Sequence, residues 1–357
     1  MGTKMDINSN CARLNNYGFK NQVGQSDNLC KNIVRIFNCC GTDQSSFQSE
    51  NYITGISTSS LVSHRPAKTI QVFTHNNANR KMSKSMCDSI VSSCNSDILF
   101  ISTEEMKNLS GAMKDSIGRS QYVIVYNSAQ KMLTVTKPKE LLSLISCPAS
   151  TAQITLVKKG VVAPVVIDHF TYRDMLNNPN KGGTVTIQKV GDMKVAMVNI
   201  HLDSRDQDER KKEINDILNK IKNKHNDINH IIVAGDFNTR NRNVQGHLIR
   251  ALQDEESFRT ELGIPQEYSV KLPTISQQEN TYKWDADVNA EAKSSRRQRN
   301  GEMQSGYLDG VAILTPRAFA KEGEADTGSI LPVGKSVVGS SFGSDHRAVT
   351  AEFTIDS

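Results

Sequence analysis

Four short patches in the C-terminal half of the chain combine side chains that can carry out acid–base and phosphate chemistry. They are Asn199-Ile200-His201-Leu202, Ala234-Gly235-Asp236-Phe237-Asn238, Tyr307-Leu308-Asp309-Gly310 and Gly343-Ser344-Asp345-His346. Each patch places a carboxylate, an imidazole or a carboxamide at the end of an apolar run typical of a β-strand. Because strand ends converge in a layered α/β protein, we expect one polar cluster. Asp, Asn and His together, without a nucleophilic Ser or Cys, indicate metal-assisted attack by water on a phosphate ester.

Asp236 and Asn238 lie two residues apart, directly after the apolar run Ile231-Ile232-Val233-Ala234. In extended backbone both side chains project to the same side. A carboxylate can accept a proton from water, and a carboxamide two residues away can orient that water or the phosphate. The pattern Gly-Asp-x-Asn is also a turn sequence. Its position immediately after a buried strand is what favours the functional interpretation.

Histidines and further carboxylates complete the candidate cluster. In Asp345-His346 the carboxylate raises the pKa of the imidazole and favours an imidazolium that can bind a phosphoryl oxygen, although such a pair alone is typical of a surface loop. His201 follows an apolar run, where a lone histidine is usually structural or exposed. Asp309 and Glu105 lie at strand edges and offer the oxygen ligands that Mg²⁺ prefers. The sequence has neither a zinc-type Cys/His spacing nor the Gly-x-Ser-x-Gly elbow of a serine hydrolase.

The elements that must position these groups are mostly strands. We predict strands over residues 70–74, 97–101, 231–234, 311–314 and 348–355, and helices over 85–94 and 205–224. We also predict two hairpins, one joining 122–126 to 132–135 through a turn at 127–130, the other joining 184–189 to 195–201 around Gly191-Asp192. Hairpins beside a helical crossover indicate mixed sheets. The expected fold class is therefore α/β, with two packed mixed sheets flanked by helices.

Length and composition predict two parts of the chain. The 357 residues are enough for one large α/β domain plus an extension. Residues 1–65 are rich in Asn, Ser, Gln and Gly. They predict a polar, partly flexible extension that serves targeting, secretion or membrane localisation, or is simply disordered. Residues 66–357 carry the periodic patterns and predict the catalytic domain.

Net charge and cysteine content indicate which partners and which cellular compartment suit the protein. The net charge of +5 is compatible with nucleic acid or phosphoinositide headgroups and selects neither. No apolar run approaches the about 20 residues of a membrane span, and the polar start lacks the core of a cleavable signal peptide. Seven unevenly spaced cysteines predict a reducing compartment. These features fit a bacterial effector delivered into a host cytosol, at or near the inner face of the plasma membrane.

In this order, the patches resemble the endonuclease/exonuclease/phosphatase superfamily, whose members include DNase I-like nucleases, sphingomyelinases and inositol polyphosphate 5-phosphatases. The resemblance covers residues 69–355 and implies a four-layer, DNase I-like α/β sandwich with a Mg²⁺ site at the tops of the sheets. It implies that Asn76, which follows Thr74-His75, and Glu105 hold the metal.

The same resemblance implies a role for each catalytic residue. His201 would contact the scissile phosphate, while Asp236 and Asn238 would activate and place the attacking water. Asp309 would orient catalytic groups or metal. The dipeptide Asp345-His346 would bind the phosphoryl group.

Three stretches resemble the 5-phosphatase branch in particular. They are Asp97 to Glu105, with Glu104 in the place of a Gln, Asn180-Lys181-Gly182-Gly183, and Thr281-Tyr282-Lys283-Trp284-Asp285. Asn238-Thr239-Arg240 also resembles the Asn-Tyr-Arg of that branch. The implied substrate-binding residues are Lys181, Arg240, Tyr282 and Lys283. In this set a Tyr hydroxyl and a Lys charge would grip the 4-phosphate. One departure is Tyr307-Leu308-Asp309-Gly310, which lacks the basic residue of the family's Trp-x-Asp-Arg.

The expected activity is a Mg²⁺-dependent phosphomonoesterase that removes the 5-phosphate from phosphoinositides such as phosphatidylinositol 4,5-bisphosphate, or from soluble inositol polyphosphates. The same catalytic core could serve a DNase I-like phosphodiesterase on DNA, which Tyr282-Lys283 disfavours. A catalytically inactive binding module is the third alternative. We expect a monomer that makes peripheral contact with membranes.

Overall fold

The computed structural model describes most of the chain after residue 64. The described residues are 65–78, 80, 83–106, 109–131, 149–174, 178–204, 206–239, 252, 254–275, 281–282, 284–285, 290–291, 298–299, 302–303, 307–319 and 328–356. All of them belong to one compact unit, Ser57–Ser357. The predicted N-terminal extension, residues 1–65, lies outside the described residues apart from Arg65.

The larger sheet contains the first two strands of the described chain. Among the described residues its strands are β1 (Thr69–Asn76), β2 (Ile98–Met106), β3 (Tyr122–Lys131), β4 (Ala149–Lys158), β10 (Thr274–Ile275), β16 (Ser329–Val338) and β17 (Val349–Asp356). Their order across the sheet is β10-β16-β17-β1-β2-β4-β3. β1 runs parallel to β2 and antiparallel to β17, so the sheet is mixed.

The smaller sheet contains most of the sequence patches. Among the described residues its strands are β5 (Val165–Asp174), β6 (Asn178–Val190), β7 (Met193–His201), β8 (His230–Asp236), β9 (Tyr268–Lys271) and β15 (Asp309–Pro316). Their order is β5-β6-β7-β8-β15-β9, with β7 parallel and β15 antiparallel to β8. Two further short pairs are β11 (Trp284–Asp285) with β12 (Ala290–Glu291) and β13 (Gln298–Arg299) with β14 (Glu302–Met303).

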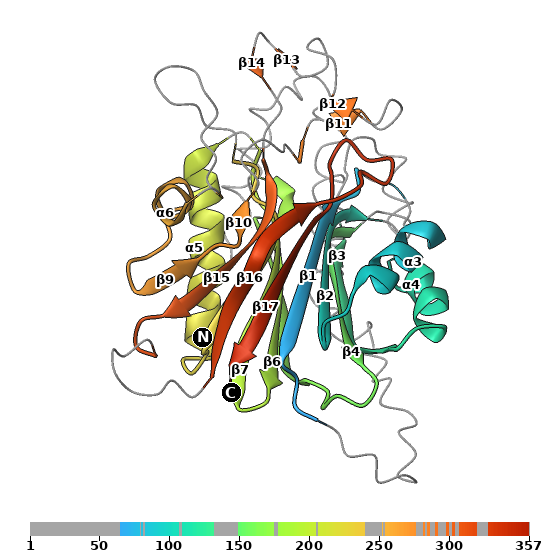
Figure 1. Cartoon of the computed structure of the whole chain (residues 1–357). Coiled ribbons are helices and arrows are strands. Elements are labelled where there is room, and N and C mark those ends of the chain that lie inside the picture. The colour runs from blue at the N-terminus through green and yellow to red at the C-terminus, as the bar shows by residue number, and fades with distance from the viewer. Residues whose placement is uncertain are drawn as a thin grey trace, which may run out of the picture. The chain divides into compact units, whose positions relative to one another are not determined.

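Helices cover the outer faces of the two sheets. Within the described residues, α3 (Lys84–Ser93) and α4 (Leu109–Gly118) lie beside β1 to β4 in Figure 1. On the other side, α5 (Gln207–Lys224) packs against β5 and β6, and α6 (Glu255–Leu262) packs against β9 and α5. Buried apolar side chains form one core between the sheets and one under each helix pair. This arrangement is the four-layer α/β sandwich with mixed sheets that the sequence predicted. No helix in the described part is long and apolar enough to cross a membrane.

Local sequence signals explain where the helices begin. Ser83 precedes α3 and accepts a hydrogen bond from the backbone N–H of Met86, while Asp206 does the same for the first turn of α5. Such side chains satisfy N–H groups that have no partner inside a helix. Acidic residues in the first turn of α5 and lysines in its last turn also match the helix dipole. The predicted helices over 85–94 and 205–224 are therefore present, shifted by one or two residues at their ends.

One predicted hairpin is wrong and the other is confirmed. β3 runs through the predicted turn at 127–130 and pairs with β4, with register shifts along the pair. The pairing with a long, distant strand overrides the turn preference of the local residues. The second predicted strand of that hairpin, 132–135, lies outside the described residues. The turn at Gly191-Asp192 does join β6 to β7, and Gly191 has a φ of 59° there.

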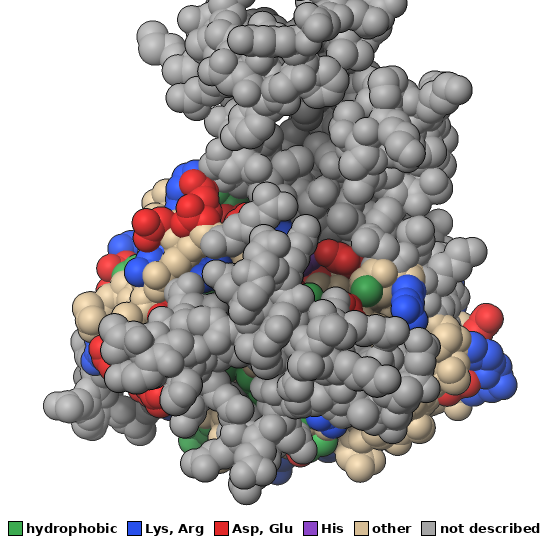
Figure 2. Space-filling view, turned by 90° about the horizontal axis from the view of Figure 1, so that it is seen from above, with side chains coloured by type: hydrophobic (Ala, Val, Ile, Leu, Met, Phe, Trp, Pro, Cys, Tyr) green, Lys and Arg blue, Asp and Glu red, His purple; other side chains and the backbone are tan. Residues whose placement is uncertain are grey.

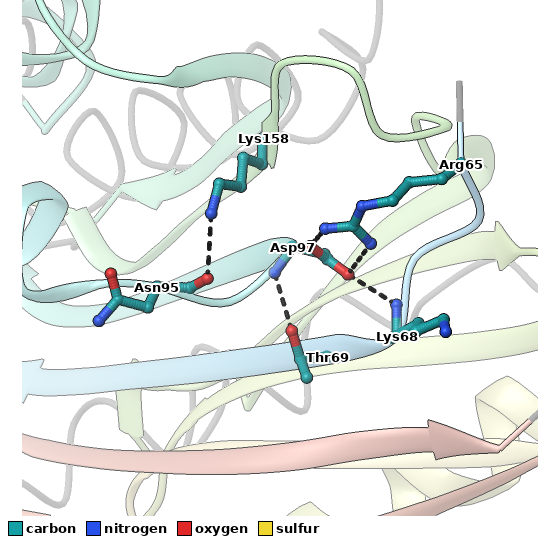
Figure 3. Close-up of a pocket in the computed structure, with 6 residues that line it drawn as sticks. All are labelled: Arg65, Lys68, Thr69, Asn95, Asp97 and Lys158. Atoms are coloured by element: carbon teal, nitrogen blue, oxygen red, sulfur yellow. Dashed lines mark hydrogen bonds and ion pairs between the residues drawn. The ribbon is translucent and has the colours of Figure 1, made fainter. Parts of the chain in front are cut away.

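The register of β1 and β2 is fixed at the ends where the two strands begin. Arg65 donates hydrogen bonds to both carboxylate oxygens of Asp97, and the backbone N–H of Lys68 donates to the same group (Figure 3). Asp97 in turn donates its backbone N–H to Thr69 Oγ1 at 3.0 Å. These contacts border a small pocket at the end of the sheet where both strands start. At the opposite ends of the strands, the resulting register pairs Asn76 with Glu104.

Candidate active site

The predicted catalytic residues meet at one edge of the two sheets. Asn76, His201 and Asp236 are the last residues of β1, β7 and β8, Glu105 lies near the end of β2, Asp309 begins β15, and Asp345 and His346 precede β17. The carboxyl ends of the parallel pairs β1–β2 and β7–β8 meet, because Asn76 at the end of β1 donates a hydrogen bond to Asp236 at the end of β8. Seen from that side, acidic side chains lie next to a histidine (Figure 2). The predicted convergence of strand ends is therefore present.

Asp309 and His346 form a buried pair. His346 Nδ1 lies 2.9 Å from Asp309 Oδ2 and 3.2 Å from Oδ1, and the carboxylate is completely buried. Burial would lower the pKa of His346, but the charge of Asp309 and the hydrogen bond to it raise that pKa to about 9. Burial raises the pKa of Asp309 to about 6, against the opposing effect of His346. Near neutral pH the pair is therefore imidazolium and carboxylate, and the carboxylate that chiefly raises the pKa of His346 is Asp309 rather than the neighbouring Asp345 that the sequence suggested.

Asp236 is held by hydrogen bonds on both oxygens. Its Oδ2 accepts from Asn76 Nδ2 and its Oδ1 accepts from the backbone N–H of Asn238, each at 3.0 Å. Asp236 is also the direct register partner of Asp309 in the antiparallel pair β8–β15. Ligand atoms of Asp236, Asp309 and His346 all lie within 4.8 Å of one another. The hydrogen bonds thus hold the Asp236 carboxylate beside Asp309 and His346, which the sequence predicted to belong to the same phosphate site.

His201, Lys181 and Glu105 form the other side of the site. His201 Nε2 lies 3.7 Å from Asp236 Oδ2 and 3.8 Å from Glu105 Oε1, and it also contacts Lys181 Nζ. Burial raises the pKa of Glu105, whereas the charges of Lys181 and His346 lower it. A cationic amine therefore lies among the acidic groups, where a phosphate oxygen would also need a positive partner.

Asn238 is next to Asp236 but its amide is anchored. The residue has a φ of 51°, and its Nδ2 donates to the carbonyl of Leu202 at 3.0 Å. Left-handed backbone is unusual for any residue other than glycine, and Asn adopts it more readily than most. This contact connects the end of β8 to the segment after His201. Asn238 therefore fixes the backbone that presents both residues.

The structure describes two of the four predicted substrate-binding residues, Lys181 and Tyr282. Tyr282 is half-buried, forms a β-bridge with His346, and its ring contacts the His346 ring at 4.5 Å between centroids, tilted by 42°. Lys181 lies against His201 as described, and Asp345 is half-buried beside His346. Arg240 and Lys283 lie outside the described residues.

Sequence reasoning missed side chains that hold the catalytic groups in place. Thr281 Oγ1 accepts the backbone N–H groups of Leu308 and Asp309, at 2.9 and 3.1 Å. Ser344 Oγ donates to the carbonyl of Asn76 at 2.7 Å and accepts from the backbone N–H of His346. Both residues stood inside motifs already singled out. The sequence could not show which other motif each of them contacts, because the tertiary structure sets those contacts.

The donor set fits a divalent cation of the hard, oxygen-preferring kind. Glu105 and Asn76 lie at adjacent strand ends, next to the group of Asp236, Asp309 and His346. Glu104 is completely buried, and its Oε2 has no hydrogen-bond partner among the described residues. Burial and the charges of Asp309 and Asp236 raise the pKa of Glu104 well above its ordinary value, so its neutral form is favoured unless a cation offsets these charges.

Comparison with known proteins identifies the family. Residues 73–266 match the model of the Endonuclease/Exonuclease/phosphatase family 2. That segment is more than half of the 357 residues, and the chain therefore belongs to this family, whose superfamily consists of hydrolytic phosphoesterases. A comparison with curated proteins found no match.

Solved structures share the fold at low sequence identity. The inositol polyphosphate 5-phosphatase domain of SPsynaptojanin, in complex with inositol (1,4)-bisphosphate and calcium ion, is 15% identical with a TM-score of 0.52, over 80% of this chain and 84% of that one. A Cimex nitrophorin, in its ferrous NO complex, is 10% identical with a TM-score of 0.52, over 82% and 100%. D. rerio TDP2 with a single-strand DNA product is 14% identical with a TM-score of 0.48, over 80% and 98%. The first two likenesses, with TM-scores of 0.52, concern the fold alone, and the side chains must decide the function.

Proposed function

We propose that this protein is a Mg²⁺-dependent phosphomonoesterase that removes the 5-phosphate from phosphoinositides, such as phosphatidylinositol 4,5-bisphosphate, or from soluble inositol polyphosphates. The observation that carries the proposal is the buried group of Asp236, Asp309 and His346, with ligand atoms within 4.8 Å, beside His201 and Glu105. The proposed general base, the imidazolium and the proposed metal ligands thus lie at the same edge of the two sheets. Each of these groups can contribute to the attack of water on phosphorus.

In the proposed reaction Asp236 accepts a proton from the water that attacks phosphorus. The bond from phosphorus to the 5-oxygen of inositol breaks as the new P–O bond forms, and the departing oxygen takes up a proton from solvent. The hydrogen bonds from Asn76 and Asn238 hold its carboxylate in one orientation, which favours proton transfer along a defined direction. His346 has Nδ1 engaged by Asp309, so its Nε2–H is the donor for a phosphoryl oxygen.

A bound Mg²⁺, held by Asn76 and Glu105, would neutralise the charge that develops on the phosphoryl oxygens. Lys181 and His201 would contact the same phosphate from the other side of Asp236. An amine that balances the buried carboxylates also favours a doubly charged phosphate monoester over a singly charged diester.

The choice of an inositol phosphate rests on Tyr282, Lys181 and the stretch around them. The Tyr282 ring lies against the His346 ring, so it borders the site where the phosphoryl group would bind. The neighbouring structure of a 5-phosphatase domain carries inositol (1,4)-bisphosphate, which supports the same substrate class here. If the substrate is a phosphoinositide in a bilayer, the enzyme must make peripheral contact with the membrane. We propose that it does so as a monomer.

The test is a phosphate-release panel with Mg²⁺, run on phosphatidylinositol 4,5-bisphosphate vesicles, inositol polyphosphates, sphingomyelin vesicles and plasmid DNA. We expect phosphate from the first two substrates. In Asp236→Asn we expect kcat to fall by about 10²-fold or more, because the base is removed. Asp192→Asn is the matched control, since Asp192 is fully exposed in the β6–β7 turn.

Three results would contradict the proposal. Nicking of plasmid without phosphate release would identify the DNase I-like alternative. Binding of inositol phosphates without turnover would identify an inactive binding module. Full phosphate release by Asp236→Asn would show that another group accepts the proton.

A further inference from the structure

His75 is a completely buried histidine beside the candidate site, and the proposed reaction does not use it. It precedes Asn76 at the end of β1. Adjacent residues of a strand face opposite sides. Asn76 contacts Asp236, so His75 points the other way, toward the apolar core that lies under α3 and α4 and contains Phe73. A polar ring buried in such a core needs a hydrogen-bond partner.

The partner of His75 lies in the segment that leads to Asp345-His346. His75 Nε2 is 3.1 Å from the carbonyl oxygen of Ser341. A carbonyl oxygen can only accept, so Nε2 carries a proton and donates it, whether the ring is neutral or charged. Burial is the main reason that the pKa of His75 falls to about 4, so near neutral pH the ring is neutral and this N–H is its one donor.

Ser341 to Ser344 form a turn that determines where His346 lies. The Ser344 N–H donates to the same Ser341 carbonyl at 2.8 Å. Phe342 has a φ of 47°, in the left-handed region that is unfavourable for a bulky side chain, and its ring meets the His75 ring edge-on at 5.8 Å between centroids. Ser344 Oγ then accepts the backbone N–H of His346. A strained turn persists only where surrounding contacts hold it.

Two consecutive residues of β1 hold this turn at its two ends. His75 donates to the Ser341 carbonyl, and the carbonyl of Asn76 accepts from Ser344 Oγ at 2.7 Å. The turn is therefore attached to the same strand end that positions Asp236. From this turn His346 reaches Asp309 on the smaller sheet. If the turn moves, His346 moves relative to both carboxylates.

We propose that His75 is a positioning residue, whose Nε2–H anchors the Ser341–Ser344 turn and thereby fixes His346 for contact with a phosphoryl oxygen. The role of His346 at phosphate rests on the proposed function, whereas the anchoring of the turn does not. His75 itself touches no substrate in this scheme. The anchor matters because a small displacement of a catalytic group lowers the rate steeply.

The experiment compares three substitutions of His75. His75→Gln places an amide N–H the same number of bonds from Cβ as Nε2, so it can still reach the Ser341 carbonyl. His75→Asn places that N–H one bond nearer the backbone, and His75→Leu keeps apolar bulk without a donor. Hydrogen exchange of peptides spanning residues 341–347 in the metal-free, full-length protein measures the anchoring. Steady-state phosphate release with Mg²⁺ measures kcat and KM.

In His75→Leu and His75→Asn we expect amide exchange in residues 341–347 to be at least about 10-fold faster. We expect kcat to fall by about 10- to 100-fold, and by more than KM changes, because His346 acts most strongly on the charge that develops in the transition state. His75→Gln should keep the exchange rate and most of kcat. His230→Leu is the matched control. His230 is also buried, with Nδ1 2.9 Å from Thr315 Oγ1, but it begins β8, far along the strand from Asp236. It should change neither measurement.

Thermal unfolding checks that each variant folds, and if His75→Leu does not, the comparison of His75→Gln with His75→Asn decides. Unchanged exchange, or faster exchange with unchanged kcat, would overturn the positioning role. Equal losses in all three variants would also overturn it, because packing of the ring on Phe342 would then hold the turn. In these cases phosphate release by the wild type would leave the proposed function standing. The expected exchange pattern without phosphate release from any substrate would keep the anchor and reject the proposed function.

Discussion

At the scale of single residues, the His346–Asp309 pair combines burial with opposite charge. Burial alone would make both groups neutral, because each charged form is better solvated in water. The 2.9 Å contact reverses this for the imidazole and raises its pKa to about 9. His346 can therefore remain positively charged at pH values where a free histidine would be neutral.

The raised pKa of His346 predicts a pH dependence of stability. A group that binds its proton more tightly in the folded state stabilises the fold fully below its unfolded pKa, 6.5 here, and the contribution is lost as the pH rises toward about 9. His346→Gln keeps a hydrogen-bond donor but no charge. We expect the difference in free energy of unfolding between wild type and variant to be large at pH 6 and small at pH 9.5.

Urea denaturation of the metal-free proteins at both pH values measures this difference. His225→Gln is the control, since His225 lies in the helix-end region near Asp168 and away from the site. A difference that stays constant from pH 6 to pH 9.5 would show that His346 carries no charge in the folded protein.

At the scale of elements, the close pairing of β7 and β8 brings His201 beside Asp236. The two residues are register partners in this parallel pair. One residue earlier, Gly235 has a φ of 140°, and a Cβ atom there would lie 2.0 Å from the carbonyl oxygen of Ile200. Only glycine permits this approach. The strand end that carries the predicted base is therefore shaped by a backbone requirement.

Gly235→Ala is expected to lower the free energy of unfolding by about 4 kcal/mol or more, because backbone strain adds to a backbone clash. Gly191→Ala is the matched control. It has a φ of 59° in the β6–β7 turn with open space around it, so it should cost about 1–2 kcal/mol. Chemical denaturation measures both, and equal losses would show that β7 and β8 can separate at little cost.

At the scale of the whole folded unit, polar side chains join the two sheets across their interface. Thr151 contacts Thr184, Gln153 contacts Thr186, and Gln188 Nε2 donates to Thr155 Oγ1 at 2.7 Å. All of these side chains are buried. Because each buried polar group needs its partner, this row fixes how β4 docks on β6. That docking brings the two strand-end sets onto one edge.

A double-mutant cycle tests this docking. Thr155→Val and Gln188→Met should each lower the free energy of unfolding by about 1–3 kcal/mol, because each leaves a buried partner unsatisfied. The double variant should lose clearly less than the sum. Thr155→Val combined with Ser92→Ala, on the exposed face of α3, should be additive within about 0.5 kcal/mol. Additivity in the Thr155–Gln188 cycle would show that the hydrogen bond does not couple the sheets.

The sequence by itself determined the strand cores, indicated the family, and singled out most of the polar residues that meet at one edge of the sheets. Apolar runs such as Ile231 to Ala234 are buried strands because their hydrophobicity requires it, whatever lies around them. Asp236, His201 and His346 follow or precede such runs, so their position at a sheet edge was a local property. The helix caps at Ser83 and Asp206 likewise depend on only a few neighbouring residues.

Only the tertiary structure decided which groups touch. The β3–β4 pairing replaced the predicted turn at 127–130, since contacts between distant segments outweigh local turn preference. The same kind of contact placed Thr281 under Asp309, Ser344 under Asn76 and the carboxyl of Glu104 in the interior. Their partners are separated by tens to hundreds of positions in the chain. Spacing along the sequence carries no information about such pairs, because register and sheet packing set them.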